Sequence, residues 1–135
     1  KGLSTTLRDY IFEWENRNDI PVKLDIQNSR SLGLETEQAV YRTIQESLAN
    51  IARHSKARQG EVSLIYHPDL LEVIISDDGI GFDIDHKNES MGLRSIRERI
   101  GSVRGTVQVH SAPGEGTRIL IQIPLKKTET EKKQS

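Results

Sequence analysis

Two adjacent acids and two glycines follow a buried-looking strand in the segment VIISDDGIGFD, residues 73–83. The simplest interpretation is a tight turn, because Asp-Gly pairs favour turns and glycine tolerates a positive φ. A chemical role is the alternative. The carboxylate of Asp77 can accept a hydrogen bond from an exocyclic amine such as that of adenine, whereas the carbonyl group of guanine would be repelled. Gly79 and Gly81 would let the backbone approach a flat ring.

A second polar group lies on a predicted helix. At about 100° per residue, Glu46, Asn50 and His54 share one face, well away from the apolar stripe. A solvated face is the simplest interpretation of these residues and of Arg53, but Asn50 is a poor helix former. The alternative is a site for a divalent cation with phosphates, because magnesium prefers oxygen ligands such as the Asn50 carbonyl. Glu46 would then orient a water, and Arg53 or His54 would face phosphate oxygens.

Two further glycine-bearing segments follow in the chain. The segment MGLRSIRERI opens a helix at Gly92, where free backbone N–H groups can meet a phosphate. The turn PGEGT brings Gly114, Gly116 and Thr117 to the start of a strand. The Thr117 hydroxyl would share the binding of a base with Asp77.

The elements that must position these residues follow from hydrophobic periodicity. Later strands are joined by short turns, so we expect them to pair antiparallel. We predict an α+β fold, a two-layer α/β sandwich in which three helices cover one face of a mixed sheet of about five strands. The predicted helices span residues 3–17, 35–55 and 92–103, and the predicted strands lie near 22–26, 61–67, 70–76, 105–111 and 117–125.

The totals set limits on the class of protein. The chain has 135 residues, a net charge of -1 and no cysteine. This length suits one domain, the charge argues against a general nucleic-acid binder, and the lack of cysteine favours a reducing compartment. No apolar run approaches membrane-spanning length. We expect a functional domain over 1–125 and a polar tail over 126–135. Because a helical pattern follows Lys1 at once, we expect the whole chain to be a piece of a longer protein.

Taken jointly, the order and spacing of these motifs resemble the ATP-binding domain of the GHKL superfamily, which includes sensor histidine kinases, Hsp90-type chaperones and MutL-type repair ATPases. ESLANIARHS (46–55) resembles the N box, DDGIGF (77–82) the first glycine box, GLRSIRER (92–99) the second and GEGTRILIQIP (114–124) the last. The N-x-x-R-H ending and the short segment before GLRSIRER resemble kinases of the nitrate-sensor and DesK type, whose regulators are commonly of the NarL class. The resemblance implies a Bergerat-type fold.

The resemblance also implies roles for individual residues. Asp77 would bind the adenine amino group with Thr117 beside it, and Asn50 would hold magnesium. Glu46 would be the catalytic residue that polarises or positions groups at the γ-phosphate. ATP and Mg²⁺ are therefore the expected cofactors. The remaining contacts implied are Arg53 and His54 near the phosphates, with Gly79, Gly81, Gly92, Leu93 and Gly116 around the nucleotide pocket and its lid.

A kinase of this kind needs a phosphoacceptor histidine on a dimeric helical domain. None of the four histidines, at 54, 67, 86 and 110, sits in such a context. The expected partners are therefore a dimerisation and phosphoacceptor domain outside this chain and a NarL-class response regulator, with no nucleic acid. We expect a cytoplasmic, homodimeric full-length protein that a membrane segment can anchor, and a monomeric fragment that does not phosphorylate itself.

The second glycine box departs from the pattern G-x-G-L-x-G, because Ser90 and Ser95 stand at its outer positions. Gly92 keeps the helix start, and the serine hydroxyls can donate hydrogen bonds. Three alternatives stay open. The segments RHS and GLRSIRERI speak against a serine kinase of the anti-sigma-factor type. Intact Glu46, Asn50 and Asp77 disfavour a non-catalytic nucleotide-binding module, and the segment 83–91 is too short for an Hsp90-like or MutL-like ATPase.

Overall fold

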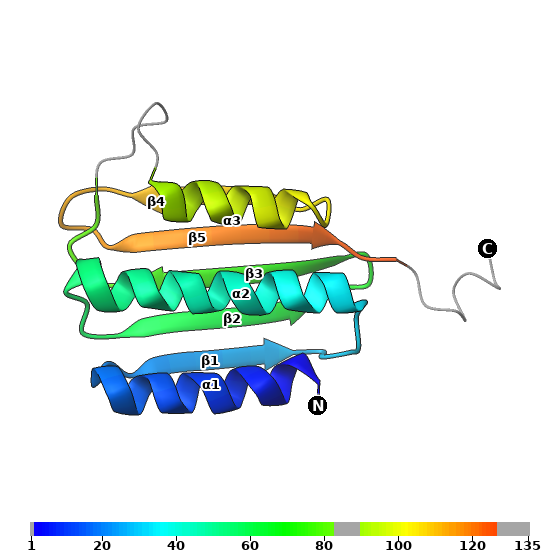
Figure 1. Cartoon of the computed structure of the whole chain (residues 1–135), viewed down its shortest axis with the longest axis horizontal. Helices are drawn as coiled ribbons and strands as arrows, with labels where there is room; N and C mark the ends of the chain where they lie inside the picture. Colours follow the sequence, from blue (N-terminus) through cyan, green and yellow to red (C-terminus); the bar gives the residue numbers. More distant parts are fainter. Residues whose placement is uncertain (1, 83–89, 127–135) are drawn as a thin grey trace.

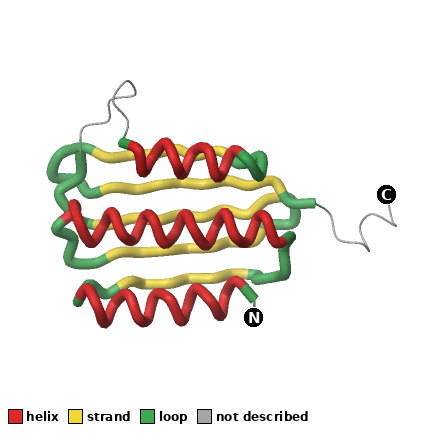
Figure 2. The backbone as a smooth tube through the Cα atoms, viewed as in Figure 1, coloured by secondary structure: helices red, strands yellow, loops and turns green. Residues whose placement is uncertain are grey.

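The computed structural model describes residues 2–82 and 90–126, apart from the side chains of His54 and Ser55. In these ranges the helices α1 (Leu3–Asn18), α2 (Leu34–Asn50) and α3 (Met91–Gly101) lie side by side across one face of a sheet (Figures 1 and 2). A π-helical turn, η1 (Ile51–Ser55), continues α2. The predicted two-layer architecture is confirmed.

The sheet has five strands in the order β1-β2-β3-β5-β4. β1 and β2 pair in parallel across the α2 crossover, and the other neighbours are antiparallel, so the sheet is mixed as predicted. The last strand is inserted between β3 and β4, a neighbour relationship that the short turns did not predict. The strands are β1 (Val22–Gln27), β2 (Gly60–Tyr66), β3 (Leu70–Asp77), β4 (Thr106–Ser111) and β5 (Thr117–Pro124).

The second helix changes type where the sequence predicted a continuous α-helix over 35–55. The α-helical segment ends at Asn50, and residues 51–55 form the π-helical turn. Because a π-helix bonds i to i+5, the α-helical spacing that grouped His54 with Glu46 and Asn50 ends at Asn50. The α-helical spacing therefore supports a shared face for Glu46 and Asn50, and the side chain of His54 lies outside the described residues.

The core lies between the helices and the helix-covered face of the sheet. Every second residue of β3 and β5 is buried there, and the same alternation places Asp77 and Thr117 at the edge of the core. Each fully buried Leu or Ile side chain stabilises the fold by about 1.5–3 kcal/mol. The fully buried residues include Leu7, Ile44, Leu48, Leu64, Leu71, Ile75, Ile96, Ile100, Ile121 and Ile123.

Candidate functional site

The ends of two helices and two strands lie together at one end of the molecule, on the left in Figure 1. They are the carboxyl ends of α2 and β3 and the amino ends of α3 and β5. Asn50, Asp77, Met91 and Thr117 are the terminal residues of these elements. Motifs more than 60 residues apart in the chain therefore meet at one edge of the sheet.

The Asp77 carboxylate is held at one oxygen. Oδ1 accepts a hydrogen bond of 2.8 Å from the Gly79 backbone N–H, which is the turn that the D-x-G pattern predicted. Among the described residues, none donates a hydrogen bond to Oδ2. Burial raises the pKa of the Asp77 carboxyl, the Gly79 N–H lowers it, and the nearby Asp78 charge raises it again. The turn and the acceptor role are therefore compatible, because they use different oxygens.

Asp78 has a different task from its neighbour. Its Oδ1 accepts hydrogen bonds from the backbone N–H groups of Arg58, at 2.8 Å, and Gln59, at 3.0 Å. These two bonds lower the pKa of the exposed Asp78 carboxyl. The second acid of the pair thus fastens the loop before β2 to the end of β3.

Asp77, Thr117 and Ser111 lie in one row across three strands. Asp77 pairs with Thr117 in the β3–β5 register, and Thr117 pairs with Ser111 in the β4–β5 register. All three side chains belong to the alternation that faces the helices. The structure therefore brings together Asp77 and Thr117, as the sequence predicted, and adds Ser111 to them.

Two glycines let the loop after β3 pack against the turn before β5. Gly81 has φ of 67°, and a Cβ there would overlap the carbonyl oxygen of Ala112. Gly116 has φ of 73°, and a Cβ there would overlap the carbonyl oxygen of Asp77. The Gly114 N–H also donates to the Ile80 carbonyl at 2.6 Å. Only glycine suits both positions, so the first and last glycine motifs form one unit.

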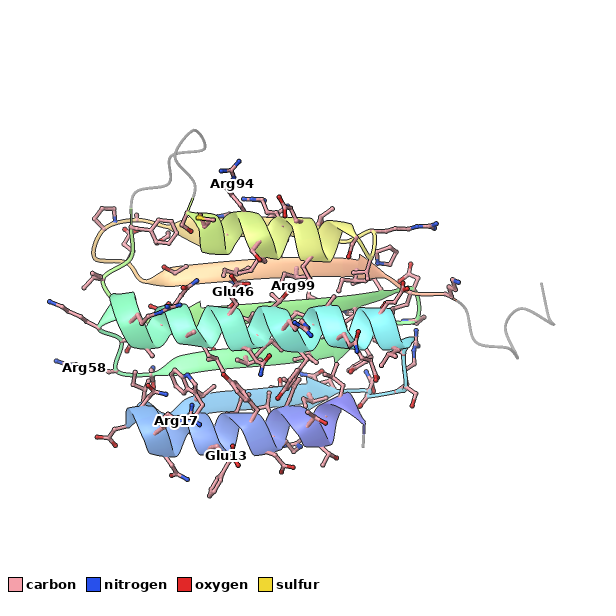
Figure 3. The ribbon with its side chains drawn as sticks, in the orientation of Figure 1. Glu13, Arg17, Glu46, Arg58, Arg94 and Arg99 are labelled. Atoms are coloured by element: carbon pink, nitrogen blue, oxygen red, sulfur yellow. The ribbon has the colours of Figure 1, made fainter. Side chains whose placement is uncertain are left out.

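Glu46 is engaged by an arginine from α3. Arg99 Nη1 donates to Glu46 Oε2 at 2.8 Å, while its Nη2 donates to Ser95 Oγ at 3.2 Å. Figure 3 shows Glu46 and Arg99 in the space between α2 and α3, whereas Arg94 lies on the outer side of α3, away from α2. This ion pair fixes α3, whose second residue is Gly92, against α2, which ends with Asn50.

Gly92 lies against the Asn50 amide. A Cβ at Gly92 would come within 3.2 Å of Asn50 Nδ2 and 3.8 Å of Glu46 Oε1. The start of α3 is fixed by Ser90, whose hydroxyl accepts from the Leu93 N–H at 3.2 Å. The hydroxyls of Ser90 and Ser95 therefore each accept a hydrogen bond from the protein, and each keeps a proton that it can still donate.

The other predicted contacts have different outcomes. Leu93 is buried, with 8% of its surface exposed, so it belongs to the core under the start of α3. Arg53 is exposed in the π-helical turn. The side chain of His54 lies outside the described residues, as do residues 83–89 of the predicted lid, which include His86.

The oxygen atoms near the end of α2 and the start of α3 could hold a hard cation only if a bound ligand supplied further oxygens. Within residues 2–82 and 90–126, no group of three or more His, Cys, Asp or Glu side chains is placed to hold a metal ion. The protein oxygens available are the Asn50 amide and the Glu46 carboxylate, which is paired with Arg99. Such a set fits magnesium that keeps its waters and shares phosphate oxygens, rather than an all-protein cage.

Sequence reasoning missed Arg99, Ser111 and Asp78. The alternation of β4 places Ser111 on the inward side, and this signal was available. No local pattern shows that Arg99 meets Glu46, since the two residues are 53 positions apart. In the described part of the chain no helix is long and apolar enough to cross a membrane.

The family described as "Histidine kinase-, DNA gyrase B-, and HSP90-like ATPase" matches residues 35–127. Sensor histidine kinase LiaS of Bacillus subtilis (strain 168) is 34% identical over 126 residues, which cover 93% of this chain and 35% of LiaS. Signal transduction histidine-protein kinase/phosphatase DegS of the same organism is 34% identical over 133 residues, covering 92% and 34%. The chain thus spans about a third of the length of these curated relatives.

Solved structures agree with the fold. The histidine kinase domain of the Erythrobacter litoralis EL346 blue-light activated histidine kinase superposes with a TM-score of 0.73 at 24% identity. That match covers 92% of this chain and 61% of the other. Acinetobacter baumannii histidine kinase AdeS gives a TM-score of 0.73 at 17% identity, covering 93% and 64%.

Proposed function

This chain belongs to the histidine kinase-, DNA gyrase B-, and HSP90-like ATPase family, and from that premise we propose that it is the ATP-binding catalytic domain of a two-component sensor histidine kinase. Residues 1–125 would form this domain and 126–135 a polar tail. The curated relatives LiaS and DegS carry kinase names, which supports this member of the family over its chaperone and repair members.

The Asp77 carboxylate is the observation on which the proposal rests. It stands at the end of β3 with one oxygen held by the Gly79 N–H and the other without a protein donor among the described residues. The amine at the six position of adenine would supply the missing donor, whereas the carbonyl group that guanine carries at that position would be repelled, so the site would select adenine over guanine. Thr117, in register with Asp77, completes the base-binding edge.

Magnesium would be held at the other end of the nucleotide. The Asn50 amide oxygen would provide a ligand, and Gly92 leaves room for the amide to lie against the start of α3. When bound, the ion would neutralise charge on the phosphate oxygens. Glu46 would position or polarise groups at the γ-phosphate, with Arg53 and His54 nearby, and catalysis would rest on positioning and electrostatic stabilisation.

The phosphate acceptor would be a histidine on a dimerisation domain of the full-length protein. The described histidines lie at the end of the π-helical turn, after β2 and in β4, none of them on a helical hairpin. The N-x-x-R-H and GLRSIRER segments support the nitrate-sensor and DesK type, with a NarL-class response regulator downstream. The full-length protein would be a homodimer with this domain in the cytoplasm.

Calorimetric titration with ADP, ATP and GDP, with and without Mg²⁺, tests the proposal. We expect adenine nucleotides to bind at least tenfold more tightly than GDP, and Mg²⁺ to tighten the binding of ATP. Asn50→Ala should remove the magnesium effect while adenine preference is retained. Equal binding of GDP and ADP to the wild-type chain would refute the adenine assignment, and an undiminished magnesium effect in Asn50→Ala would refute that role of Asn50.

A further inference from the structure

The hydroxyl of Ser111, at the end of β4, contacts three separate groups. Its Oγ accepts a hydrogen bond of 2.9 Å from the Phe82 backbone N–H. It donates to the Gly116 carbonyl at 2.8 Å. It also lies 2.9 Å from Thr117 Oγ1. One side chain therefore links the loop after β3, the turn before β5 and the first residue of β5.

The chemistry of these partners decides where the protons lie. A hydroxyl has one proton to donate and two lone pairs to accept with. The Phe82 N–H only donates and the Gly116 carbonyl only accepts, so the Ser111 proton goes to Gly116. All three contacts are then satisfied only if Thr117 donates its own proton to Ser111. The Thr117 oxygen is left with lone pairs alone for any further partner.

Thr117 stands directly beside Asp77. The two are paired in the β3–β5 register, and both belong to the strand faces covered by the helices. Asp77 Oδ2 has no donor among the described residues, and an ionised carboxylate can only accept. With its proton directed to Ser111, Thr117 can likewise only accept, so both groups match an amine with two N–H bonds and oppose a carbonyl oxygen.

We propose that Ser111 is a positioning residue that determines specificity. Its Oγ accepts a hydrogen bond from the Thr117 hydroxyl, so that Thr117 can act only as an acceptor toward the 6-amino group of adenine, directly or through one water. The inference rests on the proposed binding of adenine nucleotides. It adds a second source of discrimination to that of Asp77, located on β4, the strand next to the one that carries Thr117.

The test compares the dissociation constants of ADP and inosine diphosphate, whose base carries a 6-oxo group, for the wild-type chain and for variants at Ser111. Ser111→Ala frees the Thr117 proton for the ligand, so the preference for ADP should fall about tenfold, the worth of one hydrogen bond. Ser111→Thr keeps a hydroxyl and should keep the wild-type preference. Ser63→Ala is the matched control, because the side chain of Ser63 lies on the face of β2 that the helices do not cover. This substitution should leave the preference for ADP unchanged.

Ser111 also supports the loop at Phe82, so circular dichroism must first show that each variant is folded. If Ser111→Ala does not fold, Ser111→Cys replaces it, because a thiol of similar size is only a weak donor and acceptor and should also reduce the preference. A preference for ADP that is unchanged in a folded Ser111→Ala or Ser111→Cys variant overturns the inference and leaves the proposed function intact. Failure of the wild-type chain to bind ADP overturns both.

Discussion

Arg99 Nη1 lies 2.8 Å from Glu46 Oε2, and this pair joins the helix that follows the second glycine motif to the helix of the N-box motif. Both side chains are mostly sheltered, with 26% of each exposed. Arg99 also donates to Ser95 on its own helix, so its guanidinium is oriented by two partners. Glu46 therefore has a defined position before any nucleotide arrives.

Replacing Arg99 with glutamine should lower the free energy of unfolding by about 1 kcal/mol, because a sheltered but not fully buried ion pair is lost. Chemical denaturation measures this. Arg94→Gln on the exposed side of α3 is the control and should have little effect. A double-mutant cycle with Glu46→Gln should give a coupling energy of similar size, and additive effects of the two substitutions would contradict the pairing.

Asp77→Asn should weaken ADP binding by about a hundredfold or more, since an amide N–H would face the amino group of the base and leave polar groups unpaired. The fold should persist, because the amide oxygen can still accept from the Gly79 N–H. Calorimetry gives the affinity and thermal unfolding gives the stability. Asp78→Asn is the matched control, expected to lower the unfolding temperature while preserving affinity. Equal losses of affinity in both variants would count against the assignment.

The pKa values of the two neighbouring acids should depart in opposite directions from the ordinary aspartate value of 3.8. Burial raises the pKa of Asp77, so the folded protein binds the proton of this carboxyl more tightly than the unfolded chain does. The contribution of Asp77 to the free energy of unfolding is therefore present at low pH and is lost as the pH rises through the raised pKa. Hydrogen bonds lower the pKa of Asp78, so its contribution is present above the ordinary value and lost as the pH falls through the lowered one.

Carbon-detected NMR of the side-chain carboxyls measures both titrations. ADP binding needs an ionised Asp77 and should weaken already as the pH falls through the raised pKa of that group. Added ADP should shift the Asp77 midpoint downward and leave the Asp78 midpoint in place. An Asp77 midpoint below that of Asp78 would contradict this account of the site.

Gly92→Ala should reduce the affinity for Mg-ADP by roughly tenfold because the new methyl group would lie 3.2 Å from Asn50 Nδ2 and displace the amide. Stability should not fall with it, since alanine is the better helix former. Gly101→Ala, at the far end of α3, has no atom within 4 Å of the added Cβ and serves as the control. An unchanged affinity for Mg-ADP in Gly92→Ala would show that nucleotide binding does not depend on the present position of the Asn50 amide.

Several features of this protein could be predicted from local sequence alone. The apolar stripe of Val40, Ile44 and Leu48 predicted α2, and the branched apolar run over 73–75 predicted the buried strand that is β3. The motifs around Asn50 and Asp77 indicated a nucleotide site because their residue types and spacing are properties of the chain itself. Local periodicity also predicted the layer architecture, since each amphipathic element must bury one face.

Other features were decided only when distant segments met. Insertion of β5 between β3 and β4 placed Thr117 next to both Asp77 and Ser111, and no local pattern specifies which strand is whose neighbour. The change from α- to π-helix after Asn50, inside the helix predicted over 35–55, was also not predicted by α-helical spacing. Hydrogen bonds such as that between Arg99 and Glu46 depend on separations in space, which packing of the whole core sets and sequence spacing does not.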